Sequence, residues 1–72
     1  MKRIFRLQNL DCPVCAAKME RAVGKIEGVN SVDFCFLTQR LTLDAEDDRF
    51  DDILSCAVKK CRKIDPDCKI VL

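Results

Sequence analysis

The sequence predicts an α+β domain in which two amphipathic helices cover one face of a four-stranded antiparallel sheet. The first observation is a hydrophobic pattern whose period is two in four short segments and three to four in two longer ones. The second is the length, because 72 residues suffice for one small domain and no more. The third is the composition, since 49% hydrophobic residues provide a core without a disordered signature.

The first half of the chain predicts a strand followed by a helix. Residues 3–7 are expected to form the strand, because alternate apolar side chains fall on one face. A loop over residues 8–13 follows, and the helix is expected to run from there to about Ile26. Gly28 supplies the turn after it, where a glycine is common. The apolar stripe of this helix consists of residues three and four apart, namely Cys15, Met19, Ala22, Val23 and Ile26.

The second half predicts a hairpin, a helix and a last strand. Residues 29–36 and 40–44 both alternate, and the short turn between them indicates a hairpin. The acidic run 46–48 opens the second helix, where the helix dipole favours negative charge. Pro66 ends that helix, and residues 68–72 are expected to form the final strand. The apolar stripe of the second helix consists of Phe50, Ile53, Leu54, Ala57, Val58 and Cys61. The order strand, helix, strand, strand, helix, strand predicts the ferredoxin-like sandwich.

Charge and hydropathy exclude several classes of function. The net charge of +1 gives no electrostatic reason to bind nucleic acid or an anionic membrane. The longest apolar run is far shorter than the roughly 20 residues of a membrane-spanning helix. No apolar stretch of a secretory signal follows Lys2 and Arg3, because Arg6 interrupts it. We expect a single domain over residues 1–72 that is cytoplasmic, monomeric and not an enzyme.

Cys12 and Cys15 are the candidate functional residues. They lie where the first loop passes into the first helix, with two residues between them, so that both sulfurs can approach one ion. Pro13 suits the first helical position, because its missing N–H has no partner there anyway. Free N–H groups and the positive end of the helix dipole lower the pKa of a thiol at this place, and thiolates are the metal ligands.

Asp11 decides which metal ion the cysteine pair is expected to bind. Two thiolates alone suit a linear Cu(I) ion, whereas Zn(II), Cd(II) and Pb(II) prefer further donors. Asp11 adds a carboxylate oxygen beside Cys12. The sequence therefore predicts a site for a divalent ion with Cys12, Cys15 and Asp11 as ligands, and its open coordination positions suit delivery to a partner better than storage.

Residues 10–20 resemble the metal-binding loop and first helix of heavy-metal-associated domains, and residues 27–32 resemble the turn and second strand of that family. The resemblance covers nearly the whole chain and implies the fold predicted above. Such domains occur as free metallochaperones, as mercury carriers and within metal-transporting P-type ATPases. An Asp directly before the first cysteine is similar to the zinc-, cadmium- and lead-transporting ATPases, whose Asp role would fall on Asp11. The partner implied is a metal donor or the membrane transporter itself.

Two alternatives remain open at this point. One is a free Cu(I) metallochaperone, which is equally compatible with a domain of this length. The other is a glutaredoxin-like dithiol oxidoreductase, because that class also places a CPxC sequence after its first strand. Against it, the chain has no Thr-Val-Pro-like sequence that would place a cis proline before a strand, and no helix follows the last strand.

The other four cysteines are expected to have no chemistry. Cys61 belongs to the stripe of the second helix and Cys68 alternates with Ile70 and Leu72, so that both should pack in the core. Cys35 and Cys56 are expected at the surface. The basic residues Lys18, Arg21 and Lys25 share the outer face of the first helix, as a solvated surface or as a docking face for an acidic partner.

Overall fold

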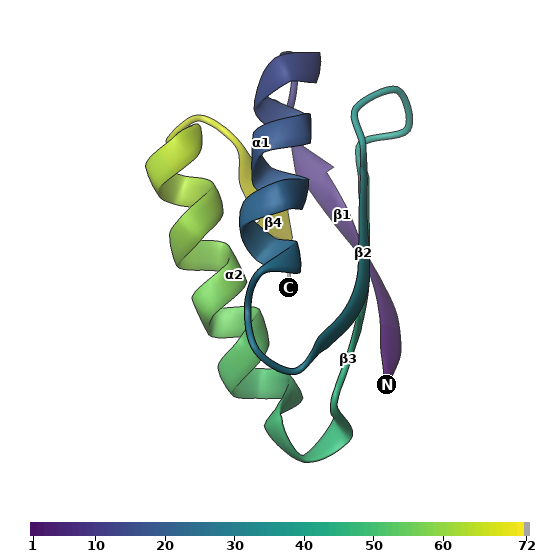
Figure 1. Cartoon of the computed structure of the whole chain (residues 1–72). Helices are drawn as coiled ribbons and strands as arrows, with labels where there is room; N and C mark the ends of the chain where they lie inside the picture. Colours follow the sequence, from purple (N-terminus) through teal and green to yellow (C-terminus); the bar gives the residue numbers. More distant parts are fainter. Residues whose placement is uncertain (72) are drawn as a thin grey trace.

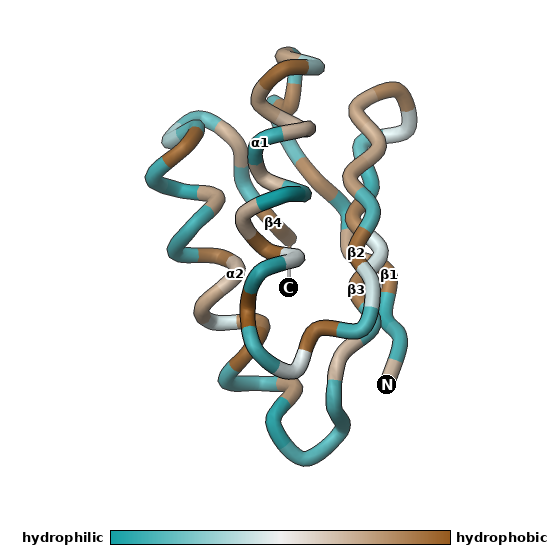
Figure 2. Tube along the Cα trace, in the orientation of Figure 1, coloured by the Kyte–Doolittle hydropathy of each residue, from teal (hydrophilic) through white to brown (hydrophobic). Residues whose placement is uncertain are grey.

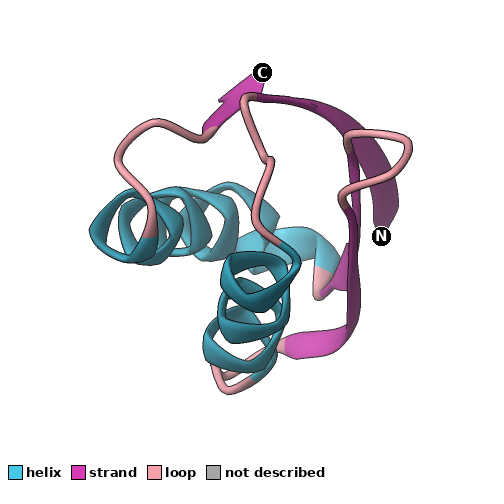
Figure 3. Ribbon diagram, turned by 90° about the horizontal axis from the view of Figure 1, so that it is seen from above, coloured by secondary structure: helices cyan, strands magenta, loops and turns pink. Residues whose placement is uncertain are grey.

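The element order is the predicted one in a computed structural model, which describes residues 1–71. Both helices lie on one side of the sheet (Figures 1 and 3), so the predicted ferredoxin-like α+β fold is confirmed. The elements are β1 (Lys2–Gln8), α1 (Pro13–Gly24), β2 (Val29–Cys35), β3 (Arg40–Ala45), a single 3₁₀ turn η1 (Asp47–Arg49), α2 (Phe50–Ile64) and β4 (Lys69–Val71).

The sheet is antiparallel throughout, with the strand order β2-β3-β1-β4. β2 and β3 form the predicted hairpin, in which Phe34 lies opposite Leu41, and a register shift near Val29 marks an irregularity at its far end. β1 lies in the centre, where Arg6 faces both Arg40 of β3 and Val71 of β4. The chain segment that leads to Cys12 therefore continues from a central strand.

The core lies between the sheet and the two helices. Hydrophobic and hydrophilic residues alternate in short bands along both helices (Figure 2), as expected from the predicted apolar stripes. Phe5 and Phe50 stack across the layers with their ring centroids 6.5 Å apart. Among residues 1–71, fifteen are buried: Phe5, Leu7, Leu10, Ala16, Met19, Val23, Phe34, Leu41, Leu43, Ala45, Phe50, Ile53, Ala57, Cys61 and Cys68.

Some predicted boundaries were wrong by one to four residues. The first helix ends at Gly24 rather than near Ile26, because Lys25 and Ile26 donate to the carbonyls of residues three positions earlier, which tightens the last turn. The second helix is preceded by η1, so its α-helical part begins only at Phe50. The second strand stops at Cys35, and the last strand begins at Lys69, with Leu72 outside the described residues.

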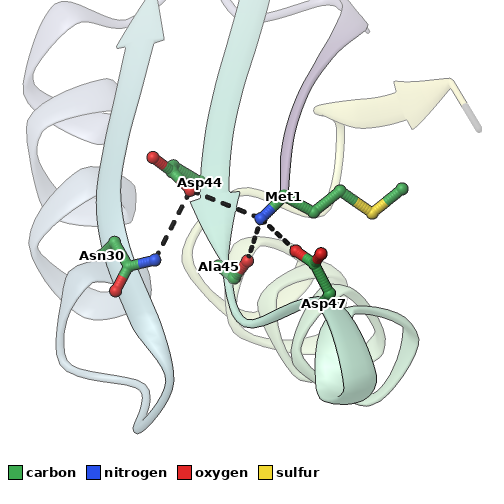
Figure 4. Close-up of polar contacts among 5 residues, drawn as sticks. All are labelled: Met1, Asn30, Asp44, Ala45 and Asp47. Atoms are coloured by element: carbon green, nitrogen blue, oxygen red, sulfur yellow. Dashed lines mark hydrogen bonds and ion pairs between the residues drawn. The ribbon is translucent and has the colours of Figure 1, made fainter.

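The amino-terminal ammonium group lies at the end of the molecule opposite the beginning of α1 (Figure 1), where it contacts the end of β3 (Figure 4). It donates a hydrogen bond of 2.7 Å to the carbonyl oxygen of Ala45 and pairs with the carboxylates of Asp44 and Asp47. The hydrogen bond to Asp47 raises the pKa of this ammonium group, and desolvation partly opposes that rise. Part of the acidic run thus has a structural partner there.

Gly28 occupies a position that only glycine fits. Its φ angle is +96°, and a Cβ atom at this place would lie 2.7 Å from Cδ1 of Ile53. We expect Gly28→Ala to destabilise the fold by about 1–3 kcal/mol through backbone strain and overpacking, measured by urea unfolding. Gly24→Ala is the matched control, because its Cβ would meet Val32 at an ordinary 3.6 Å. The control should be neutral or stabilising by up to about 1 kcal/mol, and equal losses in both variants would contradict the account.

Candidate metal-binding site

Cys12 and Cys15 lie at the beginning of α1, as predicted. Cys12 is the residue that caps the helix, with an extended backbone (φ −111°, ψ 110°), and Pro13 occupies the first helical position. Both cysteines are half-buried. The beginning of α1, the turn between β2 and β3 and the connection from α2 to β4 lie at the same end of the molecule (Figure 1), so the site is surrounded by three loops.

The sulfur of Cys12 takes the place of the oxygen that usually caps a helix. It accepts a hydrogen bond of 3.2 Å from the backbone N–H of Cys15, one of the N–H groups that have no partner within the helix. This interaction positions the Cys12 sulfur over the first turn of α1, on the same side as Cys15. The two thiols are therefore neighbours before any ion binds.

The pKa values of the two cysteines are shifted in opposite directions. A hydrogen bond from the Cys15 thiol, followed by the Cys15 N–H, lowers the pKa of Cys12. The same thiol–thiolate contact raises the pKa of Cys15, and burial raises it further. The lowering expected at the helix start thus applies to Cys12 alone, and the pair holds one thiolate and one thiol over an intermediate range of pH.

Gln39 holds the loop that carries the cysteines. Its side-chain oxygen accepts a hydrogen bond of 3.0 Å from the N–H of Leu10, and its side-chain nitrogen donates to the carbonyls of Leu10 and Phe36. Leu10 is fully buried, although it belongs to the loop. Gln39 lies in the turn between β2 and β3 with a positive φ of 55°, a role that the sequence pattern did not indicate.

Acidic residues surround the site on one side. Asn9, Asp11, Cys12, Asp65 and Asp67 line an open depression of about 350 Å³. Asp65 comes from the connection between α2 and β4. Its negative charge disfavours the thiolate form of both cysteines, although the pKa of Cys12 is lowered overall. The sequence analysis missed Asp65 and Asp67, because only the fold brings them to Cys12.

Asp11 is exposed at the edge of this depression. Within residues 1–71, no three or more Cys, Asp or Glu side chains are already grouped as a complete metal site. The structure therefore brings the two cysteines together and leaves the carboxylate of Asp11 beside them at the surface. Its role as a third ligand stays a prediction.

None of the other four cysteines lines the depression at Cys12. Cys61 and Cys68 are buried, as predicted, and burial raises the pKa of Cys61 to about 12. Cys35 and Cys56 are half-buried rather than exposed. A hydrogen bond from the Thr38 side chain lowers the pKa of Cys35.

Comparison with known proteins assigns the fold and the loop to one family. The family model of the heavy-metal-associated domain matches residues 4–64. The zinc/cadmium/lead-transporting P-type ATPase of Escherichia coli is 41% identical over 44 residues, which are 61% of this chain. The cadmium, zinc and cobalt-transporting ATPase of Bacillus subtilis is 33% identical over 66 residues, or 92% of this chain. The matched segments span only 6% and 9% of these two relatives.

Solved structures share the fold at lower identity. A CopZ metallochaperone superimposes with a TM-score of 0.77 at 20% identity, covering 99% of this chain and 100% of that one. The N-terminal domain of a potential copper-translocating P-type ATPase from Bacillus subtilis gives 0.78 at 23% identity, covering 99% and 84%. These structures confirm the architecture.

The contact between the two thiols predicts how one substitution changes the other cysteine. Cys15→Ala removes the thiol that donates to Cys12, so we expect the pKa of Cys12 to rise and its thiolate to appear only at higher pH. Ultraviolet absorption of the thiolate against pH, together with the alkylation rate of Cys12 near neutral pH, measures this change. Cys56→Ala is the control and should leave both unchanged. A Cys12 pKa that stays constant or falls in Cys15→Ala would contradict the role of the hydrogen bond from the Cys15 thiol.

Proposed function

Because the chain belongs to the heavy-metal-associated domain family, whose members are metal-binding modules, we propose that it takes up Zn(II), Cd(II) or Pb(II) and passes the ion to a partner. Cys12 and Cys15 supply two thiolates, and Asp11 supplies a carboxylate oxygen. The domain itself binds and releases the ion and performs no catalysis. The observation that carries the proposal is the pair of neighbouring sulfurs at the start of α1, one of which has a lowered pKa.

The charges around the site favour a divalent ion. Two thiolates with a monovalent ion make a complex of charge −1, whereas a divalent ion with two thiolates is neutral and tolerates one more carboxylate. Asp11, Asp65 and Asp67 line the depression at Cys12 and would repel the negatively charged Cu(I) complex. This argument supports Zn(II), Cd(II) or Pb(II) over the copper metallochaperone alternative.

The open position of the site supports transfer by ligand exchange. Val14 lies between the two cysteines and is 62% exposed, so a partner can reach the loop directly. A thiolate or carboxylate of the partner would enter the open coordination positions before Cys12 and Cys15 release the ion. Such a shared intermediate avoids a free ion in solution.

The proposed setting is the cytosolic side of a metal-transporting P-type ATPase, as a domain of the transporter or as its separate metal donor. The names of the matched relatives, which are transporting ATPases for zinc, cadmium, lead and cobalt, support this setting. No helix within residues 1–71 combines the length and the apolar character needed to cross a membrane. The glutaredoxin-like alternative has no support from the matched family.

Titration with Cd(II) tests the cysteine ligands. We expect the reduced protein to develop thiolate-to-metal charge-transfer absorption that saturates at one ion per chain. Cys12→Ser and Cys15→Ser should each abolish most of that absorption, because one thiolate alone binds Cd(II) weakly. Cys56→Ser, which alters a half-buried cysteine on α2, is the control and should titrate like the parent protein. Unchanged absorption in Cys12→Ser would exclude the proposed site.

Asp11→Asn tests the third ligand. We expect the affinity for Zn(II) to fall about tenfold, or about 1.4 kcal/mol, because an amide is a poorer ligand than a carboxylate. Asp67→Asn is the matched control, since it removes the same charge from the same depression. Competition with a chromophoric zinc chelator measures both affinities. If the two variants lost affinity equally, Asp11 would act through its charge and not as a ligand.

A further inference from the structure

Cys61 and Cys68 form a second pair of cysteines, distant from Cys12 in sequence. Cys61 lies near the end of α2, and Cys68 directly precedes β4; their exposed fractions are 2% and 6%. Asp65 links them through the backbone, because its N–H donates to the carbonyl of Cys61 (2.9 Å) and its carbonyl accepts from the N–H of Cys68 (3.2 Å). This compact turn brings the two thiols to the same edge of the core.

Both cysteines line one cavity of about 190 Å³ at the place where α2 meets β4. The charge of Cys68 adds to the burial that raises the pKa of Cys61, which agrees with sulfurs that lie near each other. Burial likewise raises the pKa of Cys68, with a contribution from Asp65. Both thiols are therefore protonated at neutral pH, and only an ion with a strong preference for sulfur can displace the two protons.

The rest of the cavity lining limits which ion fits. Its other residues offer no carboxylate and no imidazole, so an ion that needs four ligands would find only two. A linear two-coordinate ion needs no more than the two sulfurs. The remaining lining residues are Val58, Arg62, Pro66, Lys69 and Ile70.

The charges of the lining residues also favour a monovalent ion. Arg62 and Lys69 line the cavity, and both residues are exposed. Two thiolates with a monovalent ion carry a charge of −1, which two nearby cations offset, whereas the neutral complex of a divalent ion gains no such stabilisation. The lining thus has two cations and no carboxylate, unlike the acidic depression at Cys12, although Asp65 acts on Cys68 from outside the lining.

We propose that Cys61 and Cys68 form a second metal site, which binds one soft monovalent ion, Cu(I) or Ag(I), between two sulfurs. Binding breaks two S–H bonds, releases two protons to water and forms two metal–sulfur bonds without any change of oxidation state. The ion would connect α2 to β4 next to the acidic depression. The chain would then separate two classes of ion, with divalent ions at Cys12 and Cys15 and monovalent ions here.

The experiment uses a Cys12→Ser/Cys15→Ser variant, so its result does not depend on the proposed function. Cu(I) is supplied without oxygen as the complex of a chromophoric chelator, and the loss of colour counts the ions withdrawn. We expect one ion per chain. Adding Cys68→Ser should abolish uptake, and adding Cys56→Ser should preserve it. If the parent variant withdraws no Cu(I), or if Cys68→Ser leaves uptake intact, the proposal is wrong.

A second pair of variants tests the cavity without altering the core. In the same background, Arg62→Glu/Lys69→Glu reverses two charges at the cavity, while Lys60→Glu/Lys63→Glu reverses two exposed charges of α2 outside its lining. We expect the first pair to weaken Cu(I) binding at least tenfold and the second to change it by less than twofold. Equal weakening by both pairs would overturn the placement of the ion in this cavity. Circular dichroism shows whether each variant is folded.

Discussion

The burial of Leu10 is the constraint on which the candidate site depends. Leu10 is the only residue of its loop that is fully buried among those that the structure describes, and both its backbone N–H and its carbonyl are bound by the side chain of Gln39. An amide side chain that satisfies both groups lets the backbone at Leu10 enter the core without unpaired polar atoms. Cys12 follows two residues later, so the position of its sulfur at the start of α1 derives from this anchor.

The electrostatics of the loop follow from a second local arrangement. Because Cys12 caps the helix, its sulfur accepts hydrogen bonds from the backbone N–H and from the thiol of Cys15, and Cys12 becomes the more acidic of the two. Asp65 opposes the ionisation of both thiols from the other side of the depression. A cation bound as proposed would relieve that repulsion. The same arrangement disfavours a bound complex that remains negative.

The two cysteine pairs show how the environment, and not the residue type, decides the chemistry. Cys12 and Cys15 are half-buried at a helix start beside carboxylates, whereas Cys61 and Cys68 are buried beside Arg62 and Lys69. The first environment lowers the pKa of one sulfur, and the second raises the pKa of both. The sequence pattern distinguished the CxxC pair from two core cysteines, and the structure adds that the two pairs differ in the protonation states accessible to their sulfurs.

The sequence by itself determined the element order, the hairpin, the glycine turn at Gly28 and the placement of Cys12 and Cys15 at the start of a helix. These features are local, because hydrophobic period, helix-capping position and turn residues depend on neighbours within a few positions. Only the tertiary structure decided that Gln39 holds the loop at Leu10 and that Asp65 faces the cysteines. It also decided that Cys61 and Cys68 share one cavity. Such contacts join segments that are brought together by packing, and no local spacing in the chain records which loops the sheet and helices place at the same end.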